Sequence, residues 1–316
     1  MYASNALLLS NSAREVHMLL VLARNRVFFV TTKFGKLVAF LLESSLFIAL
    51  SGVAALCFSF LLYELPFNVL LLLCFFLTVF SVYSLNKLTD EREDAVNLPE
   101  RTRFVAKNRR YVALAVLVAY SSAVILALAH SVYAALVIAL PLVIGFLYSV
   151  GVSSFRLKNV KGLKSLVVAS TWAITLTLLP LAVSSRPALL VLIVVLFFFF
   201  VRFFVNTVLF DIRDLEGDVA SGLTTIPAYL GKNKTKNLLV LVNSTLVVWL
   251  AYTSLQGLFH QFLAVLIFSI GYASYYVLYF CAKEKRIGKS MDFVVDGEWL
   301  LIVTFAFLVL SNTSLT

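Results

Sequence analysis

The sequence predicts an all-α integral membrane protein with nine transmembrane helices. Sixty-one per cent of its 316 residues are apolar and only 13% are charged, a composition far from that of soluble domains. Apolar runs of about 20 residues, the length needed to cross a hydrocarbon core of roughly 30 Å, recur along almost the whole chain. The basic residues gather in alternate connections between these runs. This alternation is typical of a multi-pass protein.

The nine spans are separated by polar connections. Their expected boundaries are 38–58, 66–86, 111–129, 132–150, 163–183, 187–209, 238–256, 260–281 and 293–311. The chain then divides into an N-terminal segment, 1–35, and a single transmembrane domain, 36–316.

The N-terminal segment is predicted to contain a helix lying at the membrane surface. Apolar residues between Ala13 and Val30 recur at helical spacing, with arginines among them. Such an amphipathic pattern favours the interface. A solvated linker is the alternative interpretation.

The distribution of basic residues predicts the orientation. All Lys and Arg residues except Arg186 and Arg202 precede the first span or follow the second, fourth, sixth and eighth. By the positive-inside rule these connections face the cytoplasm. The N-terminus is therefore expected in the cytoplasm and the C-terminus outside.

A first acidic motif lies at the cytoplasmic end of the second span. Asn86, Asp90 and Asp94 are spaced by four residues. On one continuous helix this spacing would align their side chains in a stripe. Their oxygen atoms are ligands of the kind that magnesium prefers.

A second acidic motif lies at the cytoplasmic end of the sixth span. It contains Asp211, Asp214 and Asp218, and the last two repeat the spacing of four. Equivalent motifs on spans two and six predict two pseudo-equivalent four-helix units followed by one extra helix, with the site between the halves.

A solvated rim of charges is the plain alternative for either motif alone. Two motifs with the same spacing, on the same side and four spans apart, favour a shared site instead. Carboxylates that face one another repel unless a cation bridges them. Bound metal is therefore the natural expectation.

These motifs resemble those of the UbiA prenyltransferase superfamily. The family's pattern N-x-x-x-D-x-x-x-D matches Asn86 to Asp94, and its later D-x-x-x-D matches Asp214 to Asp218. The resemblance extends to the string from Asp94 to Arg101. It also includes Tyr148-Ser149 followed by Arg156 and Lys158. Departures at Lys87, Leu98 and Thr102 leave the branch of the superfamily open.

The resemblance implies an enzyme that uses Mg²⁺ to activate an allylic isoprenyl diphosphate. It would transfer the isoprenyl group to a lipophilic acceptor, such as a quinone precursor, an aromatic or a glycerol lipid, and release diphosphate through a carbocation-like state. The implied metal ligands are Asn86, Asp90, Asp94, Asp214 and Asp218. Whether Asp211 is a ligand or a base stays open.

A basic clamp is expected to hold the diphosphate. Its candidates are Arg101, Arg156, Lys158 and Lys161, each of which could instead contact lipid phosphate. Tyr148 is a further candidate for substrate binding. The expected partners are the donor, the acceptor and membrane lipid, with no nucleic acid, and the oligomeric state stays open.

Two charges, Glu43 and Arg202, stand isolated inside predicted spans. Buried membrane charges are costly, so they suggest a role. The two side chains could pair with each other, or Arg202 could orient the motif side chains from one side. Direct contact of Arg202 with substrate is the less favoured alternative.

Two other classes of membrane protein remain as alternatives. A cation-coupled transporter would also carry intramembrane charges and a duplicated fold, but its acidic residues should lie near the midplane. A CDP-alcohol phosphotransferase also uses a D-x-x-x-D motif with a divalent metal. Its first motif begins D-G-x-x-A-R, a string that precedes neither Asp90 nor Asp214.

Overall fold

The computed structural model describes residues 35–150, 160, 162–183, 187–282, 288 and 290–313. Helices make up the regular structure of these residues, and no strand occurs among them. Among these described residues, those before residue 45 and those from residue 45 onward belong to two separate compact units. The predicted interfacial helix between Ala13 and Val30 lies outside the described residues. The predicted domain boundary at residue 35 stays a prediction.

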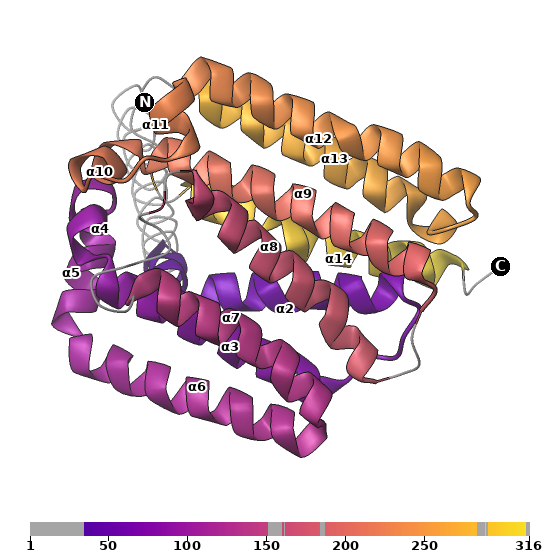
Figure 1. The fold of residues 1–316 in the computed structure, drawn as a ribbon, viewed down its shortest axis with the longest axis horizontal. Coiled ribbons are helices and arrows are strands. Elements are labelled where there is room, and N and C mark those ends of the chain that lie inside the picture. The colour runs from indigo at the N-terminus through magenta and orange to yellow at the C-terminus, as the bar shows by residue number, and fades with distance from the viewer. Residues whose placement is uncertain are drawn as a thin grey trace, which may run out of the picture. The chain divides into compact units, whose positions relative to one another are not determined.

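The second unit is a bundle of long helices joined by short ones (Figure 1). Its first half contains α2 (Leu46–Leu62), α3 (Val69–Thr89), α4 (Glu91–Asn97), α5 (Pro99–Lys107), α6 (Arg109–His130) and α7 (Val132–Ser149). Its second half contains α8 (Leu163–Leu178), η2 (Leu179–Ala182), α9 (Leu189–Arg213), α10 (Leu215–Ala220), α11 (Ile226–Leu230), α12 (Lys232–Leu255), η3 (His260–Phe262), α13 (Leu263–Ala282), the π-helical turn η4 (Asp292–Asp296) and α14 (Glu298–Thr313).

Eight helices of the described chain are long and apolar enough to cross a membrane, or nine if Gly35–Glu43 and α2 form one broken span. The continuous first span predicted over 38–58 is wrong. Its helix is interrupted at Ser44 and Ser45, where Ser45 adopts a left-handed backbone with φ 67°. Such a conformation cannot continue a right-handed helix. The other eight spans coincide with helices whose ends differ by a few residues.

Local signals explain several helix ends. The side chain of Asn68 accepts a hydrogen bond from Leu71 N at 3.1 Å and begins α3. Likewise, the side chain of Ser131 accepts a hydrogen bond from Ala134 N at 3.0 Å and begins α7. Ser131 is the one residue between α6 and α7. Both satisfy backbone donors that a helix N-terminus leaves free. Such short connections force neighbouring helices to run antiparallel.

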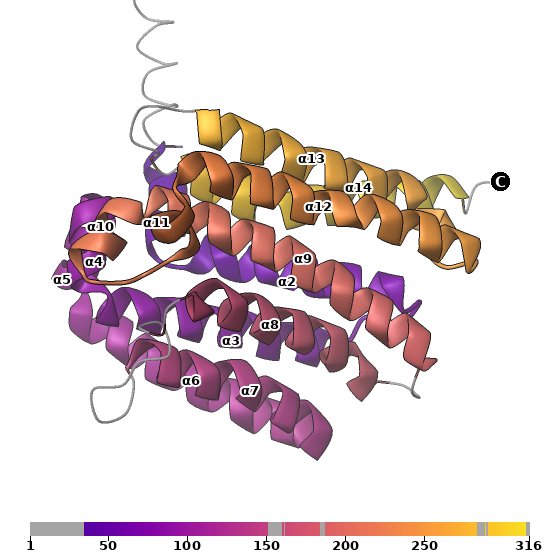
Figure 2. The same cartoon turned by 45° about the horizontal axis from the view of Figure 1, so that its top comes forward.

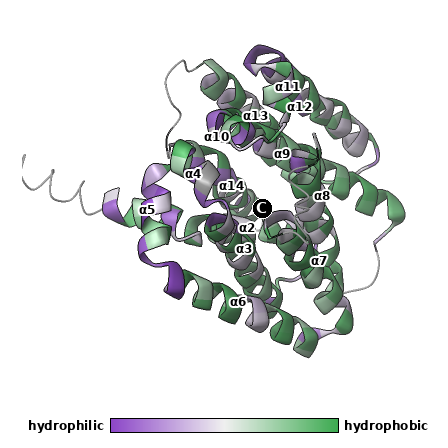
Figure 3. Cartoon of the chain, turned by 60° about the vertical axis from the view of Figure 1, so that its left-hand side comes forward, coloured by the Kyte–Doolittle hydropathy of each residue, from purple (hydrophilic) through white to green (hydrophobic). Residues whose placement is uncertain are grey.

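Helix α3 packs against α2, α6 and α7, while α9 packs against α8 and α12 (Figure 2). Aromatic side chains fill much of the interior of the second half. Phe198 stacks on Trp249 with ring centroids 5.2 Å apart, and Trp299 packs on Phe199 at 5.5 Å. The long helices are apolar over most of their length, whereas polar residues gather in the short helices α4, α5 and α10 and at the beginnings of α6 and α12 (Figure 3). This contrast fits a bundle whose sides face lipid.

The buried Arg202 of α9 is paired inside the bundle. Its Nη2 forms an ion pair with Oε2 of Glu298, and its Nη1 donates to Oδ1 of Asn243 at 3.3 Å. Both charged side chains are 0% exposed. The predicted pairing of Arg202 with Glu43 is therefore wrong. Because these partners lie on α12 and α14, Arg202 joins helices and does not orient the motif side chains.

Candidate functional site

The first acidic motif lies at a break between two helices. Asp90 both ends α3 and begins α4, with φ −98° and ψ 27°. Asn86 belongs to α3 and Asp94 to α4. The backbone remains hydrogen-bonded across this break, because Asp94 N donates to Asp90 O at 2.9 Å. The single straight stripe predicted for these three residues is therefore wrong, since the helix breaks at the middle one.

The second motif has the same local construction. Asp214 ends α9 and begins α10, with φ −90° and ψ 6°, and Asp218 lies in α10. Here too Asp218 N donates to Asp214 O at 2.9 Å. The two motifs are thus equivalent in their local backbone. The duplication of whole four-helix units stays a prediction.

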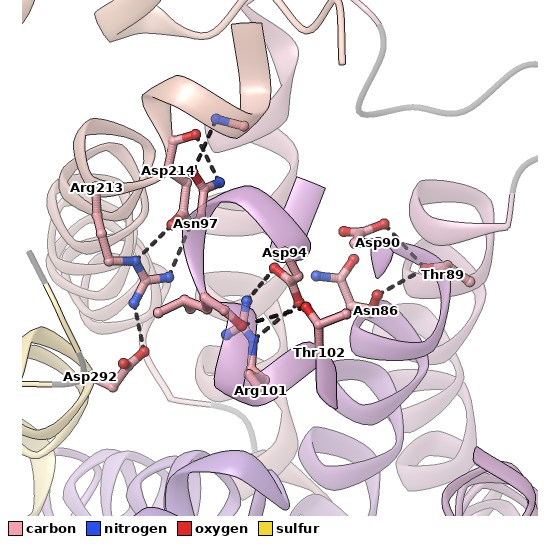
Figure 4. A network of polar contacts seen from close by, with 12 residues as sticks. Asn86, Thr89, Asp90, Asp94, Asn97, Arg101, Thr102, Arg213, Asp214 and Asp292 are labelled. Atoms are coloured by element: carbon pink, nitrogen blue, oxygen red, sulfur yellow. Dashed lines mark hydrogen bonds and ion pairs between the residues drawn. The ribbon is translucent and has the colours of Figure 1, made fainter. Parts of the chain in front are cut away.

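Asn97, the last residue of α4, joins the two motifs. Its Nδ2 donates to the carbonyl oxygen of Asp214 at 3.0 Å, and its Oδ1 accepts from Gly217 N at 3.0 Å. The side-chain amide therefore spans from the first motif to the backbone of the second (Figure 4). As expected, motifs that lie over 100 residues apart in sequence meet at one end of the bundle.

Each motif holds one carboxylate in a fork of arginine nitrogens. Arg101 Nε donates to Asp94 Oδ2 at 3.0 Å, and its Nη2 pairs with Oδ1. Arg213 Nε and Nη2 donate to the two oxygens of Asp214 at 2.7 and 2.9 Å (Figure 4). Burial alone would raise the pKa of Asp214, but the Arg213 guanidinium holds it below its ordinary value. Such bidentate pairs are among the stronger polar contacts in proteins.

Arg213 also reaches the last membrane helix. Its Nη1 donates to Asp292 Oδ1 at 2.7 Å, and its guanidinium carbon lies 4.6 Å from the ring centre of Phe210. Asp292 begins the π-helical turn η4, and Asp296 ends it. A π-turn inside a membrane helix often marks a functional region. The extra helix after the two predicted units thus contributes acidic side chains to the site.

Lys164 holds two more carboxylates of the second motif. Its Nζ lies 2.9 Å from Asp211 Oδ1 and 2.7 Å from Asp218 Oδ2. Ser165 Oγ donates to the other oxygen of Asp211 at 2.5 Å. Burial, together with the nearby Asp211 carboxylate, raises the pKa of Asp218 to about 6, and Lys164 offsets this only in part.

The end of α7 completes this side of the site. Ser149 Oγ donates to Asn86 Oδ1 at 3.2 Å. The neighbouring Tyr148 lies within electrostatic range of Asp90, Asp218 and Lys164. Tyr148 therefore lies near both motifs, and its role in substrate binding stays a prediction. The other basic-clamp candidates, Arg156, Lys158 and Lys161, lie outside the described residues.

Sequence reasoning missed four residues of this network, namely Asn97, Lys164, Arg213 and Asp292. Two signals were available: Asp292 and Asp296 repeat the motif spacing of four, and Arg213 directly precedes a motif aspartate. No local signal marked Lys164, because its partners belong to other helices.

The donor chemistry of the site suits magnesium. Among the described residues no group of three or more His, Cys, Asp or Glu side chains converges closely enough to hold a metal. Within that same part of the chain, six Asp side chains interact with four cationic ones, and a seventh, Asp90, lies near Tyr148 beside them. They are Asp90, Asp94, Asp211, Asp214, Asp218, Asp292 and Asp296, with Lys87, Arg101, Lys164 and Arg213. Oxygen ligands with excess negative charge fit Mg²⁺.

Together, the fold and the site define an integral multi-pass membrane protein with a polar, acid-rich site at one end of an apolar helical bundle. The UbiA prenyltransferase family model matches residues 45–296 of the chain. The chain belongs to this family, and it is a prenyltransferase that transfers isoprenyl groups.

Solved structures of the family share this fold at low sequence identity. A UbiA homolog from Archaeoglobus fulgidus bound to GPP and Mg²⁺ is 16% identical, with a TM-score of 0.61 over 86% of this chain and 99% of that one. A digeranylgeranylglyceryl phosphate synthase is 14% identical, with a TM-score of 0.55 over 87% and 96%. An apo UbiA homolog from Aeropyrum pernix K1 is 15% identical, with a TM-score of 0.55 over 86% and 98%. No curated protein sequence matched the chain.

Proposed function

We propose that this chain catalyses the Mg²⁺-dependent transfer of an isoprenyl group from an allylic isoprenyl diphosphate to a lipophilic acceptor. One observation carries the proposal: Asn97 joins two acidic motifs, each with an arginine partner, at one end of an apolar bundle. The A. fulgidus relative, which binds GPP or DMAPP together with Mg²⁺, supports the choice of donor.

Oxygen atoms of both motifs would hold the metal. The ligands are Asn86, Asp90, Asp94, Asp214 and Asp218. When bound, Mg²⁺ neutralises charge that develops on the departing diphosphate. Arg101 and Arg213 lie at the same place and add positive charge there. Electrostatic stabilisation of the leaving group is the largest contribution that such a site can make.

Aromatic side chains on α3 and α8 supply an apolar surface beside the motif. The ring of Tyr83, three residues before Asn86, stacks on Trp172 with centroids 5.8 Å apart and an interplanar angle of 9°. Phe75 meets the edge of Trp172 at 5.8 Å. Aromatic faces stabilise a nearby cation, and excluding water protects a reactive isoprenyl cation from hydrolysis.

Asp211 has a supporting role in this proposal. Lys164 engages one of its oxygens and Ser165 the other. A carboxylate held at both oxygens is poorly placed to take a proton from an acceptor. We therefore assign Asp211 to holding Lys164 in place.

The two alternative functions are less well supported. A transporter should carry its acidic residues near the midplane, whereas both motifs lie where long apolar helices end. The family match also decides against a CDP-alcohol phosphotransferase.

We further propose that the motifs face the cytoplasm and that the C-terminus lies outside. The support is the concentration of basic residues in the connections on the motif side,. The polar donor would then enter from the cytoplasm, while its chain and the acceptor occupy the membrane.

The experiment is diphosphate release and product analysis with purified full-length protein in lipid nanodiscs. Geranyl and geranylgeranyl diphosphate serve as donors with Mg²⁺, against a panel of quinone-precursor, aromatic and glycerol-lipid acceptors. We expect a prenylated product by mass spectrometry, lost on chelation of the metal and in Asp90→Asn and Asp214→Asn. Glu91→Gln is the matched control, because Glu91 adjoins Asp90 but forms an exposed pair with Arg109. If no donor is consumed with any acceptor, the proposal is wrong.

A further inference from the structure

Lys164 stands at an unusual place for a cation. It is the second residue of α8, a helix that begins after Gly162, whose backbone has φ 70°. The N-terminus of a helix carries partial positive charge, which disfavours a lysine there. Lys164 at this position therefore requires a stronger interaction, which the carboxylates of Asp211 and Asp218 supply.

These carboxylates come from two different helices. Asp211 belongs to α9 and Asp218 to α10, and each side chain is only 3% exposed. The start of α8 is itself fixed, because Gly162 N donates to Thr224 O at 3.1 Å. Ser165 holds the second oxygen of Asp211. The ammonium group thus lies between carboxylates of the second motif, on a helix end anchored to the loop that follows α10.

We propose that Lys164 is a tethered cation that occupies the second acidic motif until the diphosphate arrives, and so couples metal binding there to donor binding. This inference rests on the proposed function. Asp211 and Asp218 with the Lys164 ammonium, together with Asp214 and its Arg213 partner, leave the second motif with a single negative charge, too little to attract a divalent ion strongly. A divalent ion can bind fully only when the ammonium moves to a new anionic partner. The diphosphate supplies that partner.

Lysine suits this role better than arginine. Its ammonium is a compact charge on a flexible stem with three rotatable donors, so it can change partners. The forked Arg101 and Arg213 pairs instead fix their carboxylates at two points each. The consequence is an ordered site: metal binds weakly to the empty enzyme and tightly together with diphosphate.

The test measures metal binding and requires no turnover. Mn²⁺ binding to the purified full-length protein is followed by the electron paramagnetic resonance of free Mn²⁺, with and without inorganic pyrophosphate, against protein-free samples that measure the Mn²⁺ bound by pyrophosphate itself. For the wild type we expect weak binding alone and at least roughly tenfold tighter binding with pyrophosphate, within the usual range of coupling between sites. For Lys164→Met we expect binding without pyrophosphate to tighten by about tenfold, and the effect of pyrophosphate to shrink.

Matched variants distinguish the loss of the Lys164 charge from a general disturbance of the structure. Lys164→Arg keeps the charge and should keep weak binding in the absence of pyrophosphate. Lys234→Met removes an exposed lysine from the first turn of α12 and should leave both values unchanged. If Lys164→Met fails to fold, Lys164→Met combined with Asp211→Asn removes one charge of each sign. It should bind Mn²⁺ more tightly than Asp211→Asn alone.

The outcomes distinguish the two proposals. If the wild type shows the pyrophosphate effect but Lys164→Met behaves identically, the tethered-cation inference is wrong and the proposed function stands. If the wild type binds no Mn²⁺ even with pyrophosphate, both proposals are overturned.

Discussion

The side chain of Asn97 lies between the two acidic motifs and is bonded to the second at both ends of its amide. Nδ2 donates to Asp214 O and Oδ1 accepts from Gly217 N, each at 3.0 Å. Because Asn97 ends α4 and Gly217 lies in α10, these bonds fix the two short helices against each other. This amide therefore helps to fix the relative position of the metal-ligand candidates.

Replacing Asn97 by Ala should therefore loosen the site. Two hydrogen bonds of about 1 kcal/mol each predict a loss of roughly tenfold to thirtyfold in kcat/KM for the donor. Asn108→Ala is the control, because the Asn108 side chain bonds only to Phe104 O of the preceding helix among its described contacts. Equal kinetics in the two variants would show that the bridge does not position the motifs.

The Arg101 pair with Asp94 should matter for its geometry as well as its charge. Arg101→Met removes charge-assisted hydrogen bonds worth roughly 1.5–3 kcal/mol, so we expect at least a tenfold fall in kcat/KM. Arg101→Lys should restore only part of the activity, because an ammonium cannot form the fork. Steady-state kinetics with varied donor measures both. Arg109→Met, which breaks an exposed pair with Glu91, should be near wild type,.

The buried pair of Arg202 and Glu298 should act on stability. Arg202→Met or Glu298→Leu alone leaves an uncompensated charge in a fully buried position, which costs roughly 3–5 kcal/mol. The double variant Arg202→Met, Glu298→Leu should recover much of this loss. Thermal unfolding in detergent, followed by tryptophan fluorescence, measures the stability of the wild type, the two single variants and the double variant. Additive losses in the double variant would contradict a direct pairing.

Gly297 should be needed for the π-turn that carries Asp292. A Cβ at Gly297 would collide with the carbonyl oxygen of Phe293 and would lie 3.3 Å from the ring of Phe47. Gly297→Ala must therefore shift the turn, and we expect weaker Mn²⁺ binding in the presence of pyrophosphate. Gly271→Ala is the control, since nothing lies within 4 Å of its Cβ position. Identical binding in both variants would mean that the turn tolerates the shift or does not support the site.

The proposed sidedness predicts which loops meet each compartment. In a variant with Cys57, Cys74 and Cys281 replaced, Gln256→Cys between α12 and α13 should react with a membrane-impermeant maleimide in intact cells. Ala106→Cys in α5 should react only after lysis. Both positions are exposed in the structure. The reverse labelling pattern would invert the topology.

The spans could be predicted from the sequence because the lipid bilayer determines their length and their apolar character. A bilayer requires long apolar helices, so composition and length locate eight of the nine predicted spans,. The first span was wrongly predicted as one continuous helix, because the helix breaks where the backbone of Ser45 adopts a left-handed conformation. Neither apolar character nor spacing reveals it.

The acidic motifs could also be predicted, because their chemistry lies in residues close together in sequence. Asn86, Asp90 and Asp94 follow one another within a few turns, and the family resemblance rests on the same strings. The same reasoning wrongly aligned them on one helix, since spacing cannot show that a helix ends at Asp90.

The sequence by itself thus determined a membrane-embedded bundle, its two acidic motifs and its family. Only the tertiary structure decided which charges meet: Lys164 with Asp211 and Asp218, Arg213 with Asp292, and Arg202 with Glu298. The physical reason is that the apolar pattern places a side chain along its own helix but carries no information about the helix it will face. Pairing of buried charges depends on how helices pack, and packing brings together residues that lie far apart in the chain.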